Sequence, residues 1–286
     1  MLHSDGSIVM SAPMTNFALP APKLAGGPYV MGVLNVTPDS FSDGGRWNEG
    51  AATPHALAML EAGADIIDVG GESTRPGAAP VSAEEEMARV VPVVASIRAR
   101  TNAPISIDTM KPQVALAAAR VGASMWNDVA ALREPGALET AASLNNPVVL
   151  MHMQGEPRTM QADPRYDDVV GDVIAFLRDR VAAAERAGLT DIWVDPGIGF
   201  GKSVAHNLAL LNAVARIGEE TRRPVLIGAS RKSFIGKLDP AADASTGRLG
   251  GSLAAALIAA QNGAQMLRVH DVAETVQALK VWKAAL

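Results

Sequence analysis

The sequence predicts a closed (β/α)8 barrel, the TIM-barrel class of α/β fold, built as a single domain. From Tyr29 onward, short runs rich in β-branched residues alternate with longer helix-forming segments, a pattern typical of successive βα units. We count eight such units, the number that closes a barrel. Polar, Gly-rich segments stand where several apolar runs end, as in the active-site rim of a parallel α/β protein. The chain has 286 residues, and such a barrel commonly uses about 250 as one unit.

The strands are predicted from short apolar runs that end in a polar residue or Gly. They span residues 29–35, 66–70, 105–108, 125–128, 148–152, 192–195, 225–228 and 266–269. The helices are predicted from segments rich in Ala, Leu and Glu that lie between and after these strands. The clearest of them span residues 83–100, 111–121, 166–187 and 253–262.

Several helix boundaries have local signals. Ser82-Ala-Glu-Glu85 and Asp271-Val-Ala-Glu274 both fit a capping box, in which a side chain at the helix start and a Glu three residues later satisfy amide donors. Glycines that follow a helical pattern and precede a strand are expected at left-handed positions just past a helix end. They are Gly63, Gly122, Gly188 and Gly263.

Composition limits the location and the partners of the protein. Its net charge of -5 and pI near 5.6 give no basic field, which argues against a nucleic-acid partner. The chain has no Cys, which excludes disulfides and is compatible with a reducing compartment. No run reaches the roughly 18 apolar residues that a membrane span needs, so we expect a cytoplasmic protein with no membrane partner.

The predicted domain covers residues 29–286, and no strong linker interrupts it. Residues 1–28 include Pro13, Pro20 and Pro22 and lack the basic and continuous apolar regions of a secretory signal. They are expected to be a loosely ordered N-terminal extension.

Asp108, Asn127 and Asp195 close three of the predicted strands, so a barrel would aim all three at one mouth. Carboxylates together with an amide suit a planar, donor-rich heterocycle. The alternative is that each side chain caps the helix that follows it. Three such residues at one rim favour a shared ligand over three separate caps.

Basic groups are expected on loops at the same rim and indicate an anion site. Arg75, Lys232, Arg268 and His270 follow the second, seventh and eighth strands, and phosphate sites of barrels often use the loops after strands seven and eight. Arg231 fits the same pattern. Ordinary surface ion pairs are the alternative for each basic residue taken alone.

Two nucleotide motifs and a zinc motif are excluded. A P-loop would need Gly where the chain has Pro196, and Gly197, Gly199 and Gly201 miss the dinucleotide-binding spacing. His152, His206 and His270 are too dispersed for a zinc motif, and Met151-His-Met153 is expected in the core and pocket wall.

Taken together, the polar segments resemble the dihydropteroate synthase family from about residue 31 to residue 271. Two of the most specific matches are Asn35-Val-Thr-Pro-Asp-Ser-Phe-Ser-Asp-Gly-Gly45 and Glu72-Ser-Thr-Arg-Pro-Gly77. The others lie at residues 106–109, 127–129, 151–155, 195–202, 230–234 and 268–270. Trp126 stands where the family usually has a smaller residue, and strand alternation points it towards the helix layer.

The resemblance implies a TIM barrel that makes 7,8-dihydropteroate from 6-hydroxymethyl-7,8-dihydropterin diphosphate and 4-aminobenzoate. It also implies release of pyrophosphate with Mg²⁺, assembly as a homodimer and inhibition by sulfonamides. The pterin residues that it implies are Asp108, Asn127, Met151, Asp195, Phe200 and Lys232. Those for the diphosphate are Asn35, Arg75, Arg268 and His270, with Asn35 acting through the metal. Those for 4-aminobenzoate are Thr74, Arg75, Pro76, Phe200 and Ser233.

The family mechanism is dissociative, and its catalytic residues carry over to Asp108, Lys232 and Arg268. Pyrophosphate departs first, the pterin ring delocalises the cation, and the arylamine then attacks. Two mobile loops, at residues 35–45 and 71–79, are expected to exclude water from the cation. The first of them contains Asp39, Phe41, Ser42 and Asp43.

Three other functions remain as alternatives. A pterin-dependent methyltransferase domain would need neither the Thr74-Arg75-Pro76 segment nor the Ser230–Phe234 segment, and both are present. A non-catalytic pterin-binding paralogue would be expected to have lost diphosphate or loop residues, and none is missing. A sugar-phosphate enzyme would explain the anion site but not Asp108, Asn127 and Asp195.

Overall fold

Eight parallel strands form one sheet in the computed structural model, which describes residues 19–37, 49–73, 79–155, 160–161, 163–242 and 245–286. The strands are β1 (Tyr29–Asn35), β2 (Ile66–Gly70), β3 (Ile105–Asp108), β4 (Met125–Asp128), β5 (Val148–Met151), β6 (Ile192–Asp195), β7 (Leu226–Ile227) and β8 (Met266–Val269). Their order is β6-β5-β4-β3-β2-β1-β8-β7, and a parallel bridge between Val194 and Val225 joins the two ends. The predicted (β/α)8 barrel is therefore confirmed.

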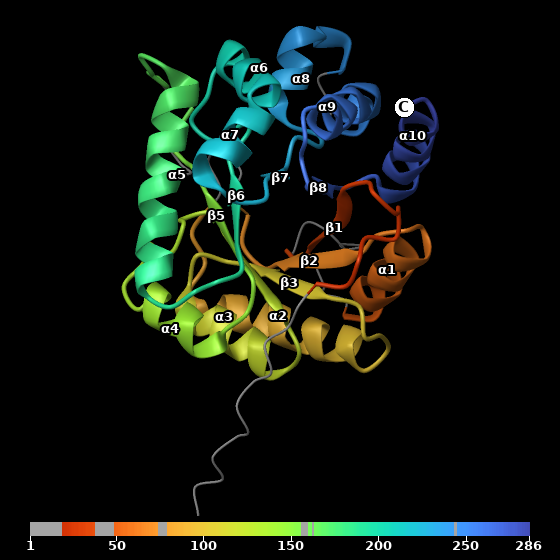
Figure 1. Ribbon diagram of the computed structural model, residues 1–286. Coiled ribbons are helices and arrows are strands. Elements are labelled where there is room, and N and C mark those ends of the chain that lie inside the picture. The colour runs from red at the N-terminus through yellow and green to blue at the C-terminus, as the bar shows by residue number, and fades with distance from the viewer. Residues whose placement is uncertain (1–18, 38–48, 74–78, 156–159, 162, 243–244) are drawn as a thin grey trace, which may run out of the picture.

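Helices surround this sheet (Figure 1). They are α1 (Glu49–Glu61), α2 (Ala83–Arg98), α3 (Pro112–Arg120), α4 (Ala137–Leu144), α5 (Val169–Arg186), α6 (Val204–Asn212), α7 (Val214–Thr221), α8 (Ser233–Leu238), α9 (Leu249–Gln261) and α10 (Val272–Ala284). Two short 3-10 turns, Pro240–Ala242 and Ser245–Arg248, link α8 to α9. Among the described residues, no helix has the length and apolar character needed to cross a membrane.

The four glycines predicted past helix ends have the expected left-handed backbone. Their φ angles are +109° at Gly63, +119° at Gly122, +93° at Gly188 and +92° at Gly263. Gly adopts these angles without the steric cost that a Cβ atom would bring, so each position can turn the chain from a helix into the next strand.

The two predicted capping boxes do not form as expected. The Ser82 hydroxyl accepts a hydrogen bond from the Glu85 amide at 3.1 Å, but the Glu85 carboxylate pairs with Arg89 on the next turn. Asp271 makes no side-chain cap for α10, because its carboxylate forms an ion pair with Arg231. In both cases a nearby Arg offers the carboxylate a charged partner, which is a stronger hydrogen-bond donor than a neutral amide.

Apolar side chains fill the space between the strands and the helices. Trp126 is fully buried in this layer, and its ring nitrogen donates to the Thr109 carbonyl at 2.8 Å. This placement confirms the outward direction that strand alternation predicts for Trp126. The apolar layer holds the helices against the barrel, so strand ends can carry polar groups without loss of the core.

A second apolar cluster plugs the amino-terminal half of the barrel. It consists of Met31, Ile66, Met125, Val149, Trp193, Leu226 and Met266, with Leu19 and Tyr29 packed against it. The part of the N-terminal extension that the structure describes also contacts the barrel. The Asp65 carboxylate accepts from the Lys23 amide at 2.7 Å and from the Val30 amide at 2.8 Å. Residues 19–28 thus cover the end of the barrel opposite the strand carboxyl ends.

Candidate active site

Strand alternation places a polar layer directly above the apolar plug. Successive side chains of a strand point to opposite faces, so the residue two positions after a plug residue also faces the barrel interior. Ile66, Met125, Trp193 and Met266 are plug residues. The residues two positions further on are Asp68, Asn127, Asp195 and Arg268. The carboxyl ends of four strands therefore bring two carboxylates, an amide and a guanidinium together.

Arg268 lies between two carboxylates at the centre of this layer. Its Nε donates to Asp68 Oδ2 at 2.6 Å, and its Nη2 donates to Asp108 Oδ2 at 2.6 Å. Asn127 Nδ2 donates to the same Asp68 oxygen at 3.1 Å. Asp108 and Asn127 are thus joined to one network across the barrel. Neither side chain caps the following helix in the hydrogen bonds that the structure describes.

Burial makes the ionisation of this network unusual. Burial raises the pKa of Asp108 to about 7, although the neighbouring Arg268 charge opposes the rise. Burial acts against the charged form of Arg268, but the carboxylates of Asp68 and Asp108 outweigh it and raise the Arg268 pKa. Perturbed pKa values of this kind are concentrated at functional sites. Asp108 can therefore change its protonation state when a ligand alters the local charge.

Asp195 and Lys232 lie on the other side of the layer. Asp195 Oδ1 accepts from the Gly197 amide at 2.7 Å, and burial raises the Asp195 pKa against the opposing effect of that bond. The Lys232 ammonium lies 3.9 Å from the centre of the Phe200 ring, within the range of a cation–π contact. The Asp195 carboxylate and the Lys232 ammonium offer an acceptor and a donor to one ligand.

An apolar wall adjoins these polar groups. Met151 and Phe200 belong to one buried cluster with Val129, Met153 and Met160, and Met110 packs against it. The predicted pocket-wall residues Met151 and Phe200 are therefore neighbours in space, beyond the polar layer of the barrel. A flat, partly apolar ring with polar edges would match an apolar wall beside carboxylates and an amide.

Lys202 is buried next to Phe200 of this wall, and the sequence did not predict it in the site. It is 2% exposed, and its Nζ lies 3.0 Å from His152 Nδ1 and 2.9 Å from the Phe200 carbonyl oxygen. Burial lowers the Lys202 pKa to about 7, and burial together with the Lys202 charge lowers the His152 pKa to about 3. Lys202 thus ties the segment after β5 to the segment after β6, where Phe200 lies.

His270 and Arg231 differ in their availability. His270 Nδ1 lies 3.1 Å from the Ser230 hydroxyl, and burial followed by the Arg268 and Arg231 charges lowers its pKa to about 3. The imidazole is therefore neutral at pH 7 and acts as a hydrogen-bonding group, not as a cation. Arg231 is held by the Asp271 carboxylate, so we assign it a structural role instead of the predicted anion contact.

The remaining predicted residues divide into two groups. Asn35 is half-buried at the carboxyl end of β1, and Ser233 is exposed at the first position of α8. Seven others lie outside the described residues. They are Asp39, Phe41, Ser42, Asp43, Thr74, Arg75 and Pro76.

Asp68 lies in the polar layer and was not identified from the sequence. It is fully buried, and its Oδ1 has no hydrogen-bond partner within the described part of the chain. A signal was present, because Asp68 is the one charged residue in the strand Ile66-Ile-Asp-Val-Gly70 and lies two positions after a plug residue. A lone carboxylate in a fully buried strand needs a partner, and Arg268 supplies one.

Comparison with known proteins assigns a family to this geometry. The family described as pterin binding enzyme matches residues 31–270. The dihydropteroate synthase of Escherichia coli K12 is 53% identical over 262 residues, which cover 91% of this chain and 92% of that protein.

Two solved structures extend the likeness to the fold. The dihydropteroate synthase of Xanthomonas albilineans with 4-aminobenzoic acid has a TM-score of 0.85 and 53% identity, and the match covers 91% of this chain and 93% of that one. The Yersinia pestis dihydropteroate synthase with a sulfonamide drug has a TM-score of 0.86 and 49% identity, over 91% of this chain and 94% of that one. The chain belongs to the dihydropteroate synthases, within the family of pterin-binding enzymes.

Proposed function

We propose that the polar layer around Arg268 is the active site in which this dihydropteroate synthase joins its two substrates. The substrates are 6-hydroxymethyl-7,8-dihydropterin diphosphate and 4-aminobenzoate, and the products are 7,8-dihydropteroate and pyrophosphate. The observation that carries the assignment is the Arg268 guanidinium between the Asp68 and Asp108 carboxylates, at 2.6 Å from each. This places a fixed cation and a carboxylate of raised pKa at one point of the barrel mouth.

The pterin ring would bind between the polar groups and the apolar wall. Asp195, Asn127 and Asp108 offer acceptors to the ring N–H groups, and Lys232 offers a donor to a ring oxygen or nitrogen. Met151 and Phe200 belong to the apolar cluster that would pack against the ring. Support comes from the burial of Asn127 and Asp195, because a buried amide oxygen or carboxylate needs a partner that donates a hydrogen bond.

The diphosphate would bind beside the pterin, with the cations Arg268 and Arg75 and the neutral groups of His270 and Asn35 as its proposed contacts. Arg268 uses only Nε and Nη2 for its two carboxylates, and a guanidinium has five N–H donors. It can therefore hold both carboxylates and contact an anion. The neutral His270 imidazole can donate a single hydrogen bond to a phosphate oxygen.

The donor set fits a magnesium ion held mainly by substrate. Mg²⁺ prefers hard oxygen ligands and is often bound through substrate phosphates and one or two protein groups. Asn35 offers an amide oxygen at the end of β1. The described residues contain no group of three or more His, Asp or Glu arranged for a metal. We therefore propose Mg²⁺ as a substrate-bound cofactor that would neutralise charge on the leaving diphosphate.

The aminobenzoate contacts are proposed from the segments after β2, β6 and β7. They are Thr74, Arg75, Pro76, Phe200 and Ser233. The relative from Xanthomonas albilineans was solved with 4-aminobenzoic acid and the relative from Yersinia pestis with a sulfonamide, which supports binding of this substrate and of this inhibitor class by the chain.

The reaction needs no protein nucleophile. The methylene carbon–oxygen bond breaks, and its electron pair leaves with pyrophosphate while Arg268 faces the growing negative charge. The resulting positive charge spreads into the pterin ring, where the Asp108 carboxylate opposes it. The amine of 4-aminobenzoate then attacks the methylene carbon and loses a proton. Lys232, beside Phe200, would hold the ring in place during both steps.

An assay of pyrophosphate release tests the proposed function. Release should require both substrates together, because the amine must trap the cation to complete a turnover. A pterin-dependent methyltransferase domain or a non-catalytic paralogue would release none. We further propose a cytoplasmic homodimer, on the basis of the Cys-free composition and of the family resemblance. Sedimentation of the purified chain would test the assembly.

A further inference from the structure

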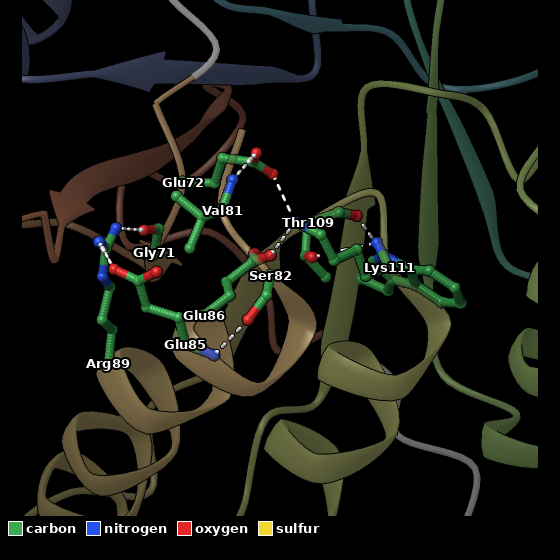
Figure 2. Close-up of polar contacts among 10 residues, drawn as sticks. Gly71, Glu72, Val81, Ser82, Glu85, Glu86, Arg89, Thr109 and Lys111 are labelled. Carbon is green, nitrogen blue, oxygen red and sulfur yellow. Dashed lines mark hydrogen bonds and ion pairs between the residues drawn. The ribbon is translucent and has the colours of Figure 1, made fainter. Parts of the chain in front are cut away.

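A buried carboxylate on α2 contacts the turn that follows Asp108. Glu86 is fully buried, and its Oε2 accepts from the Lys111 ammonium at 2.6 Å (Figure 2). Burial raises the pKa of Glu86, against the opposing effects of Lys111 and Thr109. A carboxylate is rarely buried without a partner, and the partner here lies only three residues after Asp108. The ion pair therefore joins α2 to the end of β3.

Lys111 has a second carboxylate partner at the end of β2. Its ammonium donates to Glu72 Oε2 at 2.6 Å, and Glu72 Oε1 accepts from the Val81 amide at 3.0 Å (Figure 2). Glu72 lies two residues past β2, and Gly70, the last residue of β2, pairs with Asp108 in the sheet. Lys111 is thus held by one carboxylate on α2 and by another just past β2.

Thr109 connects Lys111 to Asp108. Its amide donates to the Asn127 carbonyl at 3.2 Å, and its carbonyl accepts from the Trp126 ring nitrogen at 2.8 Å. Its hydroxyl accepts from the Lys111 amide at 3.1 Å. Because Thr109 directly follows Asp108, these bonds fix the backbone from which the Asp108 side chain leaves β3.

Arg268 holds Asp108 only from inside the barrel. Its Nη2 donates to Asp108 Oδ2 at 2.6 Å, while its Nε donates to Asp68. In the proposed function Arg268 also contacts the diphosphate, so its position depends on a group that leaves during the reaction. The contacts of Thr109 and Lys111 do not involve this group. They can keep Asp108 in place while Arg268 changes its partners.

We propose that Glu86 and Lys111 are positioning residues for Asp108 in the pterin half of the active site. The inference rests on the proposed function, because Asp108 acts there on the cationic pterin ring. A buried ion pair is weak evidence for stability, because its desolvation cost can equal its Coulombic gain. Its role here is to fix a geometry, since a misplacement of about 1 Å near the reacting atoms can cost about a hundredfold in rate.

The Glu86→Gln variant tests the proposal. Glutamine is isosteric and keeps an acceptor oxygen, but it removes the buried charge that holds the Lys111 ammonium. Glu72 remains a partner for that ammonium, so no cation is left unpaired. Loss of one charge-assisted hydrogen bond should lower kcat about tenfold in steady-state assays of pyrophosphate release.

A double variant gives a measurement that a general structural effect would not reproduce. If Glu86 acts through Asp108, adding Glu86→Gln to Asp108→Asn should lower kcat by less than about a further twofold. Independent effects would multiply instead. The double variant would then lose about tenfold more kcat than Asp108→Asn alone.

Lys111→Met is a second variant of the same ion pair. Burial already raises the pKa of Glu86, so its carboxyl group can become neutral when the ammonium is removed. The kcat of Lys111→Met should also fall. Combining it with Asp108→Asn should again add less than about twofold.

Arg98→Met is the matched control. Arg98 ends the same helix and donates to the carbonyls of Thr101, Ala103 and Gly122, which precede β3 and β4. It therefore contacts the chain before β3, whereas Lys111 contacts the chain after it. Arg98→Met should lower the melting temperature and leave kcat unchanged.

The outcomes separate this inference from the proposed function. If the native chain releases no pyrophosphate with both substrates, the proposed function is wrong. If the native chain is active and both variants of the ion pair keep the native kcat, the positioning role is wrong. A fully multiplicative loss in the double variants would also overturn it, because the ion pair would then act independently of Asp108. If one of the two variants does not fold, the other decides by the same criteria.

Discussion

Asp68 joins the groups at the centre of the site. Its carboxylate is fully buried and shares one oxygen between Arg268 and Asn127. A buried carboxylate needs a hydrogen-bonding or charged partner, and the Arg268 guanidinium supplies one. The other arm of that guanidinium contacts Asp108, whose pKa is raised to about 7 by burial. One cation therefore holds two carboxylates from neighbouring strands.

Substitutions of Asp108 and of Arg268 should change different steady-state constants. In the proposed mechanism the Asp108 carboxylate contributes most when the pterin ring becomes cationic, so Asp108→Asn should chiefly lower kcat, by about tenfold to a hundredfold. The proposed role of Arg268 is to face the diphosphate before and during bond breaking, so Arg268→Lys should mainly raise the KM for pterin diphosphate. Lysine keeps a charge beside Asp68 and avoids an unpaired buried carboxylate.

Asp163→Asn provides the control for these variants. Asp163 is exposed, lies far from Arg268 in the sequence and, among the described contacts, pairs only with Arg165. The Asp163→Asn variant should therefore keep the native kcat and KM. A change confined to KM in Asp108→Asn would make that carboxylate a binding group, and the cation would need another partner.

His152 should make the protein sensitive to acid. Its folded pKa is lowered to about 3 by burial and by Lys202, whereas an unfolded His titrates near 6.5. Below pH 6.5 the unfolded chain therefore binds a proton that the folded chain refuses. The contribution of neutral His152 to the free energy of unfolding is fully present above pH 6.5 and is lost as the pH falls towards 3. Between pH 6.5 and 5 the loss of unfolding free energy from this group is about 2 kcal/mol.

The His152→Asn variant isolates that contribution. Asparagine keeps an acceptor for the Lys202 ammonium and does not titrate. Urea unfolding at several pH values should show a smaller loss of unfolding free energy for the variant than for the native chain between pH 6.5 and 5. Parallel curves for the two proteins would contradict the assignment of the His152 pKa.

At the scale of the elements, the strand ranges could be predicted from the sequence, but the hydrogen-bond and ion-pair partners of the polar side chains could not. The ranges of β1, β2, β3, β4, β6 and β8 match the prediction, since each is a short apolar run that ends in a polar residue or Gly. The β7 strand is shorter than predicted, because Val225 makes only an isolated bridge to Val194. The two predicted capping boxes do not form, because the Glu85 and Asp271 carboxylates pair with an Arg instead. Which partner a side chain takes depends on the residues that folding places beside it.

The segment after β6 depends on glycine for a spatial reason. A Cβ atom at Gly197 would lie 1.9 Å from the His152 carbonyl oxygen, and the φ angle there is +69°. The segments after β5 and β6 are therefore interlocked, and Lys202 joins them again by its contacts with His152 and Phe200. The sequence had indicated Gly197 by the nucleotide motifs that it fails to match and by the resemblance of residues 195–202 to the family, but neither signal predicted this contact.

Gly197→Ala should be much more destabilising than a left-handed conformation alone explains. Gly136 has a similar φ of +79°, and a Cβ atom added there would meet nothing within 4 Å, so Gly136→Ala should cost only about 1–2 kcal/mol of backbone strain. Gly197→Ala adds a clash with backbone and should also weaken pterin binding, because Phe200 shifts. Thermal unfolding and pterin titration of both variants would measure the loss of stability and of pterin affinity. Equal losses in the two variants would show that the contact between Gly197 and the His152 carbonyl has no special effect.

At the scale of the molecule, the barrel closes a site from distant parts of the chain. Arg268 is 200 residues from Asp68 and 160 from Asp108. In the sheet, β1 lies between β2 and β8, so the Asp68–Arg268 contact crosses a strand position. The sequence could place each residue at the rim, but the pairing of Arg268 with two carboxylates depends on strand register and barrel closure.

The same architecture predicts the order in which substrates bind. The proposed aminobenzoate contacts lie after β2 at Thr74–Pro76 and after β6 and β7 at Phe200 and Ser233, and β2 is not a neighbour of β6 or β7 in the sheet. The proposed pterin contacts Asp108 and Asn127 lie on β3 and β4, between β2 and β6 in the sheet. If pterin and pyrophosphate complete the aminobenzoate site, 4-aminobenzoate alone should bind at least about tenfold more weakly than it does to the enzyme holding both ligands. Calorimetric titration of 4-aminobenzoate with and without pterin and pyrophosphate measures this factor. Linkage supplies an internal check, because 4-aminobenzoate must tighten the binding of the pterin–pyrophosphate pair by the same factor. Equal affinity of 4-aminobenzoate in both titrations would show that its site exists without the other ligands.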